Sequence, residues 1–260
     1  MKTALAVLVF LVAKIHPGDT EFAGKITCPG SPRPCGEFAG EEKEELKKAH
    51  EKTASLSSYF YQWELQTLVK GRAGKQAGAG EYVAPDLLTA RTGVLEVVKK
   101  GERAMVRGPK GWTRPEDDPK LQEAADLLKP PHDLVAFVIE SLQAPKREKD
   151  AELRKAKCRV TRGTLDGDGL KGLLRAGGGN LDTLEKVIDW KGCKTSVQLF
   201  VETAGGRLVK MVVESELVVS PDVAKDQPPV AMTRVVEFME LGAAKPSIVP
   251  EVREALGIKE

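Results

Sequence analysis

Long stretches in which apolar and polar residues alternate constrain the fold of this chain more than any other feature. Three of them follow one another near the C-terminus, at 195–203, 207–220 and 231–241. Such alternation predicts strands that bury one face and leave the other in water. The apolar face of the second stretch comprises Val209, Met211, Val213, Leu217 and Val219. Ala204-Gly205-Gly206 before it is typical of a hairpin turn, so these stretches are predicted to form an antiparallel sheet.

Shorter strands are predicted earlier in the chain. A run that starts at Ser57 alternates, with aromatic side chains on one face. Residues 94–99 and 103–107 are predicted to form two strands joined by a tight turn, and 158–165 resumes the pattern after a helical region. The glycine-rich segment Gly71–Gly80 is expected to be a loop tip or the turn to the next strand. Short strands at this spacing indicate an antiparallel meander.

Short helices are predicted between the strands. Glu41–Ser55 is a charged helix with a thin apolar stripe, and Pro119–Leu128 and Pro131–Leu142 are two further helical segments. The face of Pro131–Leu142 is too apolar to be left in water. A glycine-bounded segment, Asp166–Gly179, contains a shorter amphipathic helix. Its helically spaced leucines are Leu170, Leu173 and Leu174.

The N-terminus has the composition of an export signal. Lys2 precedes ten apolar residues, Ala4–Ala13, which are too few to span a bilayer, for which about 20 are needed. They match the basic start and hydrophobic centre of a secretory signal. We therefore predict that residues 1–17 are a signal peptide or N-terminal anchor, 18–40 a linker rich in proline and glycine, and 41–260 one domain. A buried N-terminal helix is the alternative.

Four cysteines in an exported chain suggest disulfides. Cys28 and Cys35 bracket a short loop that could close on itself. Cys158 and Cys193 each stand at the start of a predicted strand, and consecutive strands are neighbours about two times in three. A bridge between Cys158 and Cys193 would close a loop that holds the short apolar helices. Free buried thiols are the alternative for all four cysteines.

No motif in the chain supplies catalytic or metal chemistry. Asp166-Gly167-Asp168-Gly169 begins like a calcium loop, but Leu170 replaces a ligand and Lys171 replaces the required glycine. Gly177-Gly178-Gly179 lacks the lysine of a phosphate loop, and the three histidines are scattered. The net charge of only +2, with lysine and glutamate interspersed, provides no footprint for nucleic acid. We therefore predict no enzymatic activity, no metal, no cofactor and no nucleic-acid partner.

The positive signal is apolar surface. A sheet with aromatic and aliphatic side chains on one face, next to short apolar helices on glycine-bounded segments, suits a covered cavity for an apolar ligand. An ordinary core filled by the same side chains is an equal alternative on patterning alone.

The order of these elements resembles the LolA/LolB-like family of periplasmic lipoprotein carriers. The resemblance covers about residues 41–257 and involves the segments Leu56–Tyr61, Val160–Asp166, Asp189–Lys194, Thr233–Phe238 and Pro246–Glu251. It implies an unclosed antiparallel β half-barrel, with short helices as a lid over a hydrophobic cavity. Members of the family bind acyl chains of lipoproteins or lipids, and some relatives sense envelope stress through protein contacts. Arg91 and Arg103 are the candidates for the arginine that holds such a lid closed.

Residues and resemblance together predict a non-catalytic lipid- or lipoprotein-binding carrier of the bacterial cell envelope, which is exported, periplasmic or envelope-associated, and monomeric. The alternative is an envelope-stress sensor or interaction module on the same fold, with a filled core, no ligand and envelope proteins as partners. The predicted sheet side of the cavity comprises Tyr59, Tyr61, Trp63, Val209, Met211 and Val213. The predicted lid side comprises Phe137, Leu173 and Leu174.

Overall fold

The computed structural model describes residues 39–259 except 94, 109–110, 118–120, 123–124, 126–127, 177–183 and 225–226. The predicted export segment, nearly all of the predicted linker, and Cys28 with Cys35 therefore lie outside the described residues. So does most of the predicted helix Pro119–Leu128. Within the described part of the chain, no helix is long and apolar enough to cross a membrane.

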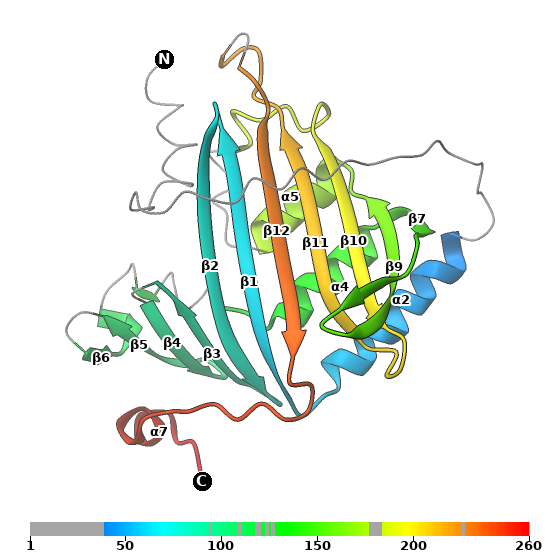
Figure 1. Ribbon diagram of the computed structural model, residues 1–260. Helices are drawn as coiled ribbons and strands as arrows, with labels where there is room; N and C mark the ends of the chain where they lie inside the picture. The colour runs from blue at the N-terminus through cyan, green and yellow to red at the C-terminus, as the bar shows by residue number, and fades with distance from the viewer. Residues whose placement is uncertain are drawn as a thin grey trace.

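The described strands form one antiparallel sheet of twelve (Figure 1). Their order is β6-β5-β4-β3-β2-β1-β12-β11-β10-β9-β7, and β8 also pairs with β9. Because β6 and β7 at the two ends do not pair with each other, the sheet is open. The strands are β1 Ser58–Val69, β2 Arg72–Val83, β3 Leu87–Thr92, β4 Leu95–Lys100, β5 Arg103–Gly108, β6 Gly111–Thr113, β7 Gln143–Arg147, β8 Ala151–Leu153, β9 Ala156–Thr164, β10 Lys194–Glu202, β11 Leu208–Leu217 and β12 Val230–Met239.

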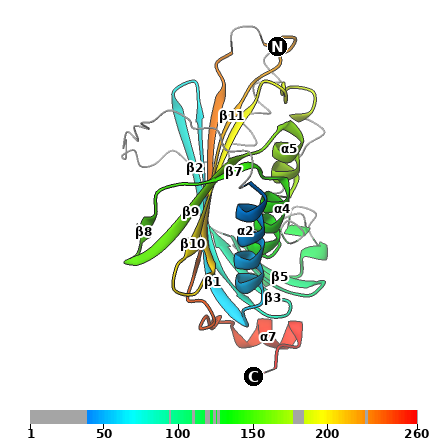
Figure 2. The same cartoon turned by 90° about the vertical axis from the view of Figure 1, so that its right-hand side faces the viewer.

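Three helices lie together on one face of this sheet, here called the inner face (Figure 2). Helix α2 packs on α4 and on β7, β10 and β11, and α4 also packs on α5. Helix α7 packs instead on β4 and β5. The helices are α2 Ala39–Ala54, α4 Pro131–Ser141, α5 Gly167–Ala176 and α7 Pro250–Leu256, with a 3₁₀ turn, η1, at Pro115–Asp117.

The predicted fold class, an unclosed antiparallel sheet with short helices, is confirmed. The three C-terminal alternating stretches are β10, β11 and β12, within a few residues at each end. The predicted short hairpin is β4 and β5. Period-2 alternation was sufficient for β10, β11 and β12 because each of these strands buries one face only. Strands β4 and β5 bury both faces, with Val98 and Met105 in one apolar cluster and Val97 and Val106 in another.

The glycine-rich segment Gly71–Gly80 is not a loop: nearly all of it belongs to β2, which pairs with β1 along its whole length. The prediction was wrong because glycine is normally depleted in strands. In β2, two of the glycines each lie beneath an aromatic side chain of the neighbouring strand β1. A Cβ built on Gly78 would lie 2.6 Å from Nε1 of Trp63, and one on Gly80 would lie 2.6 Å from the hydroxyl of Tyr61. The glycines make room for aromatic neighbours.

The main core fills the space between the inner face and α2, α4 and α5. Buried side chains of β10, β11 and β12, such as Leu199, Met211 and Val236, belong to one cluster with Val138 of α4 and Leu173 of α5. Apolar faces of amphipathic helices and the apolar phase of the strands thus cover each other.

The predicted disulfide between Cys158 and Cys193 is wrong, because both cysteines are free. Strands β9 and β10 are neighbours, but antiparallel: Cys158 pairs with Glu202 at the end of β10, whereas Cys193 directly precedes its first residue. Nine residues of strand span about 30 Å, far beyond the roughly 7 Å that a disulfide can bridge. Starts of successive antiparallel strands lie at opposite ends of the pair.

Candidate functional site

The inner face carries most of the predicted ligand-binding residues. Tyr59, Tyr61, Met211 and Val213 point into the core from the sheet and are almost fully buried. Leu173 and Leu174 of α5 are buried in the same cluster. The structure therefore brings the predicted sheet side and lid side together, with their side chains in contact.

Two predicted residues lie at the margin of this cluster. Trp63 is only partly buried, with its indole over Gly78. Phe137 of α4 is also partly buried, and its ring lies over Gly172 of α5: a Cβ at Gly172 would be 2.1 Å from Cζ of Phe137. Half-covered aromatic side chains next to a buried apolar wall are where an additional apolar molecule would first make contact.

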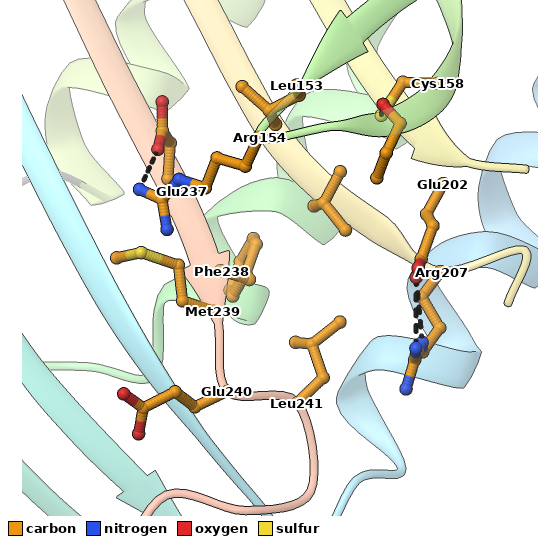
Figure 3. A pocket seen from close by; sticks show the side chains of 12 residues that line it. Leu153, Arg154, Cys158, Glu202, Arg207, Glu237, Phe238, Met239, Glu240 and Leu241 are labelled. Atoms are coloured by element: carbon orange, nitrogen blue, oxygen red, sulfur yellow. Dashed lines mark hydrogen bonds and ion pairs between the residues drawn. The ribbon is translucent and has the colours of Figure 1, made fainter. Parts of the chain in front are cut away.

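Val209 does not share a face with Met211 and Val213, contrary to prediction. A β-bulge interrupts the pairing, so that Phe200 pairs with Lys210 and Val201 with Leu208, leaving Val209 without a partner. One extra residue reverses the alternation. Val209 instead lines an open hollow of about 300 Å³ with Arg154, Glu237 and Met239 (Figure 3).

Two of the three carboxylates that line this hollow are paired. Arg154 at the turn between β8 and β9 donates to Oε2 of Glu237 at 2.7 Å, and Nζ of Lys210 lies 2.7 Å from Oε1 (Figure 3 shows the first contact). Arg207 is similarly bound to Glu202 at 3.1 Å. The carboxylates of Glu237 and Glu202 are thus satisfied within the protein, while that of Glu240 is exposed to solvent.

The end of α4 nearest Tyr59 is fixed by a histidine cluster, comprising His50, Tyr59, Tyr82 and His132. The Tyr59 hydroxyl lies 2.5 Å from Nδ1 of His132, and Nε2 of His50 lies 2.8 Å from the His132 carbonyl oxygen. The Tyr59 and Tyr82 rings stack at 5.0 Å. Tyr59 is thus engaged in holding α4, and hence the lid side, to the sheet.

Acid is expected to weaken this cluster. Burial lowers the pKa of His132 and the nearby His50 lowers it further, while Asp133 acts in the opposite direction. The pKa of His132 is lower in the folded protein than its ordinary value of 6.5. The contribution of neutral His132 to folding stability is therefore fully present above about pH 6.5 and is lost as the pH falls below this value.

His132→Gln keeps an acceptor for Tyr59 but does not titrate. The stability advantage of the wild type over this variant, measured by thermal unfolding, should shrink between about pH 7.5 and about pH 5. If the stability advantage stayed constant over this pH range, protonation of His132 would not be what weakens the cluster.

Arg234 is the inner-face residue that sequence reasoning missed. It stands on β12 in the same phase as four buried apolar residues, Val230, Met232, Val236 and Phe238. On the neighbouring strands it faces Leu65 and Val213. Burial lowers the pKa of its guanidinium, and no hydrogen bond or ion pair of the described residues involves it. A single arginine in the apolar phase of an alternating stretch was the signal that could have found it.

Two unpaired hydroxyl groups lie on the same face of the sheet as Arg234, on β11 and β10. Thr195 of β10 and Ser215 of β11 are directly opposite each other, and both hydroxyls are buried with no hydrogen-bond partner. Opposite residues have Cβ atoms about 5 Å apart. Ser215 is also the diagonal neighbour of Arg234, since Val213 is its direct partner, at about 7–8 Å. Arg234, Ser215 and Thr195, which lie in successive strands on one otherwise apolar face, are here called the Arg234 patch.

Other residues that drew attention in the sequence have structural roles. Oδ1 of Asp166 accepts a hydrogen bond from the Gly169 N–H at 2.8 Å, so the acidic turn caps α5. Arg91 pairs with Glu96 at 2.9 Å, and Arg103 donates to the Leu256 carbonyl at 2.6 Å. Neither arginine contacts the lid helices in these interactions.

No family model and no curated protein matches the chain. Among solved structures, the lipoprotein LppX of Mycobacterium tuberculosis matches with a TM-score of 0.49 and 10% identity, over 81% of this chain and 98% of LppX. LprF of Mycobacterium bovis matches with a TM-score of 0.48 and 14% identity, over 81% and 97%. A LolA superfamily protein of Nitrosomonas europaea matches with a TM-score of 0.31 and 11% identity, over 79% and 94%.

Proposed function

We propose that this protein binds the acyl chain of a lipid or lipoprotein on the inner face of its sheet, without a catalytic step. The observation that carries the proposal is the lid helix α5. Its apolar face, formed by Leu170, Leu173 and Leu174, is buried in one cluster with side chains of the sheet and of α4. An acyl chain offers the sheet the same methylene and methyl surface as these leucines, so it can take their place when α5 moves outward.

The energetics support this exchange. Each methylene that leaves water contributes about 0.8 kcal/mol, so a chain of moderate length offsets the loss of a few leucine contacts. The half-buried rings of Trp63 and Phe137 border the same cluster and would contact the chain first. Export through residues 1–17, a position in the cell envelope and a monomeric state are parts of the proposal.

The proposal is tested on protein purified from a bacterial host. We expect organic solvent to extract lipid from it, identified by mass spectrometry. After removal of lipid, the protein should bind the uncharged fluorescent probe N-phenyl-1-naphthylamine and release it when hexadecanol is added.

Two substitutions on β1 make a matched pair. Trp63 faces inward, whereas Leu68 lies in the opposite phase of the same strand and is 47% exposed. Trp63→Ala should weaken probe binding by about tenfold, since it removes most of a large aromatic contact. Leu68→Ala should leave it unchanged. Protein that yields no lipid and neither binds the probe nor releases it would contradict the proposal.

An envelope interaction module without a ligand is the second candidate. It is favoured by one observation: the side chains beneath α5 already pack against each other, Leu170 and Leu173 with no exposed surface. In that case the core is permanent and the lid does not open. Failure of the probe experiment together with unaltered folding would favour this candidate.

A further inference from the structure

We infer that the Arg234 patch receives the negatively charged head group of the ligand, a carboxylate or phosphate attached to an acyl chain. This inference rests on the proposed function and specifies its substrate class: anionic rather than neutral amphiphiles. The observation behind it is a partly buried guanidinium without a partner among the described residues, on the same face as two buried, unpaired hydroxyls, in a wall that is otherwise apolar.

The charge of Arg234 cannot be removed by deprotonation. An arginine stays protonated under all ordinary conditions, and removing an unpaired charge from water, even in part, is costly. Several other arginines of the described structure have carboxylate partners, such as Arg154 with Glu237 and Arg159 with Glu45. Folding alone gives no reason to place a cation between Leu65 and Val213. An anionic ligand provides the missing partner.

The donors suit an oxyanion. A guanidinium binds carboxylate or phosphate through two parallel N–H groups. The hydroxyls of Ser215 and Thr195 are each able to donate one further hydrogen bond. Because Ser215 is diagonal to Arg234 on the same face, an oxyanion bound by the guanidinium lies within reach of the nearer hydroxyl.

The position of the patch also suits an attached chain. Arg234 lies one row from Val236, whose direct partner on β1 is Trp63. Leu65, the partner of Arg234 itself, is likewise only partly buried. A chain whose head lies at Arg234 can therefore extend along Leu65 and Trp63. The hollow around Glu237 is less suitable for an anion, because that carboxylate is itself negative and already paired.

Three ligands with the same sixteen-carbon chain test the inference on the full-length protein: palmitate, hexadecyl phosphate and hexadecanol. Each is titrated against bound N-phenyl-1-naphthylamine, which carries no charge. We expect the better of the two anions to bind the wild type at least about tenfold more tightly than hexadecanol. Comparison of the two anions shows which head group is preferred.

Variants of the patch then assign the preference. Arg234→Met removes the charge at similar length and should abolish the preference while hexadecanol still binds. Arg234→Lys keeps a charge without the planar fork and should show an intermediate preference. Ser215→Ala should weaken only the anions, by about threefold. Arg91→Met, which removes an exposed arginine paired with Glu96, is the control and should behave as the wild type.

The possible failures are distinct. If none of the three ligands releases the probe, the proposed function is wrong. If all three bind the wild type equally, or if Arg234→Met retains the preference, acyl-chain binding stands and the Arg234 inference is wrong. Thermal unfolding gives an independent readout: without ligand Arg234→Met should melt above the wild type, and palmitate should raise the melting temperature of the wild type more than that of the variant.

Discussion

Gly80→Ala is expected to destabilise the protein by about 3 kcal/mol or more, which is a large loss for a single methyl group. A Cβ at this position would lie 1.9 Å from the Thr89 carbonyl oxygen and 2.6 Å from the Tyr61 hydroxyl. These two atoms are joined by a hydrogen bond of 2.7 Å, so the tyrosine crosses Gly80 to reach β3. The methyl group would clash with backbone as well as with the ring.

Thermal unfolding measures this loss. A decrease of about 3 kcal/mol corresponds to roughly 6–12 °C in a domain of this size. Gly108→Ala is the matched control: Gly108 is also in a strand, and a Cβ there would meet nothing within 4 Å. If both variants melted with the wild type, the close approach of Tyr61 to Gly80 would be refuted.

Thr53→Val is expected to cost about 2–3 kcal/mol, although valine has nearly the same shape as threonine. The buried Thr53 hydroxyl, at the end of α2, accepts a hydrogen bond from the Leu208 N–H at 3.0 Å. It also lies 3.0 Å from the Leu208 carbonyl and 3.1 Å from that of Ala49. Leu208 borders the bulge in β11, where the regular ladder is interrupted. Valine at position 53 would leave the buried N–H and carbonyl groups of Leu208 without the Thr53 hydroxyl as a partner.

Chemical denaturation of three proteins checks this effect. Thr53→Ser retains the hydroxyl and should lose much less stability than Thr53→Val. Ser55→Ala removes an exposed hydroxyl that donates only to the Lys52 carbonyl of the preceding helix, so it should stay within about 0.5 kcal/mol of the wild type. Equal stability of Thr53→Val and Thr53→Ser would show that the hydroxyl does not hold α2 to the sheet.

The local spacing of apolar residues predicted correctly those strands and helices that keep one regular period from end to end. The alternation of β10–β12 and the helical spacing of the leucines in α5 identified both surfaces of the core, and Leu173, Met211 and Val213 meet there. The same reasoning failed where a contact with a residue far away in the sequence determines which amino acid a strand position can hold. It treated Gly78 and Gly80 as loop residues because their partners, Trp63 and Tyr61, are on another strand.

In the candidate site, too, some features can be seen in the sequence and others arise only in the folded protein. That Arg234 interrupts an apolar phase is visible in the sequence, but that it lacks a partner depends on every neighbouring element. The orphaned hydroxyls of Thr195 and Ser215 become adjacent only through the register of β10 with β11. Polar satisfaction is a property of the assembled core, so single-strand patterns do not reveal it.

By itself the sequence determined that one face of each long strand is apolar and that short amphipathic helices must cover that face, because both periodicities are local and follow from the burial of apolar surface. Only the tertiary structure decided the register and direction of the strands. These separated Cys158 from Cys193, turned Val209 away from Met211 and placed Arg234 beside Ser215. Register depends on packing among residues far apart in the chain, and a shift of one residue exchanges the two faces of a strand.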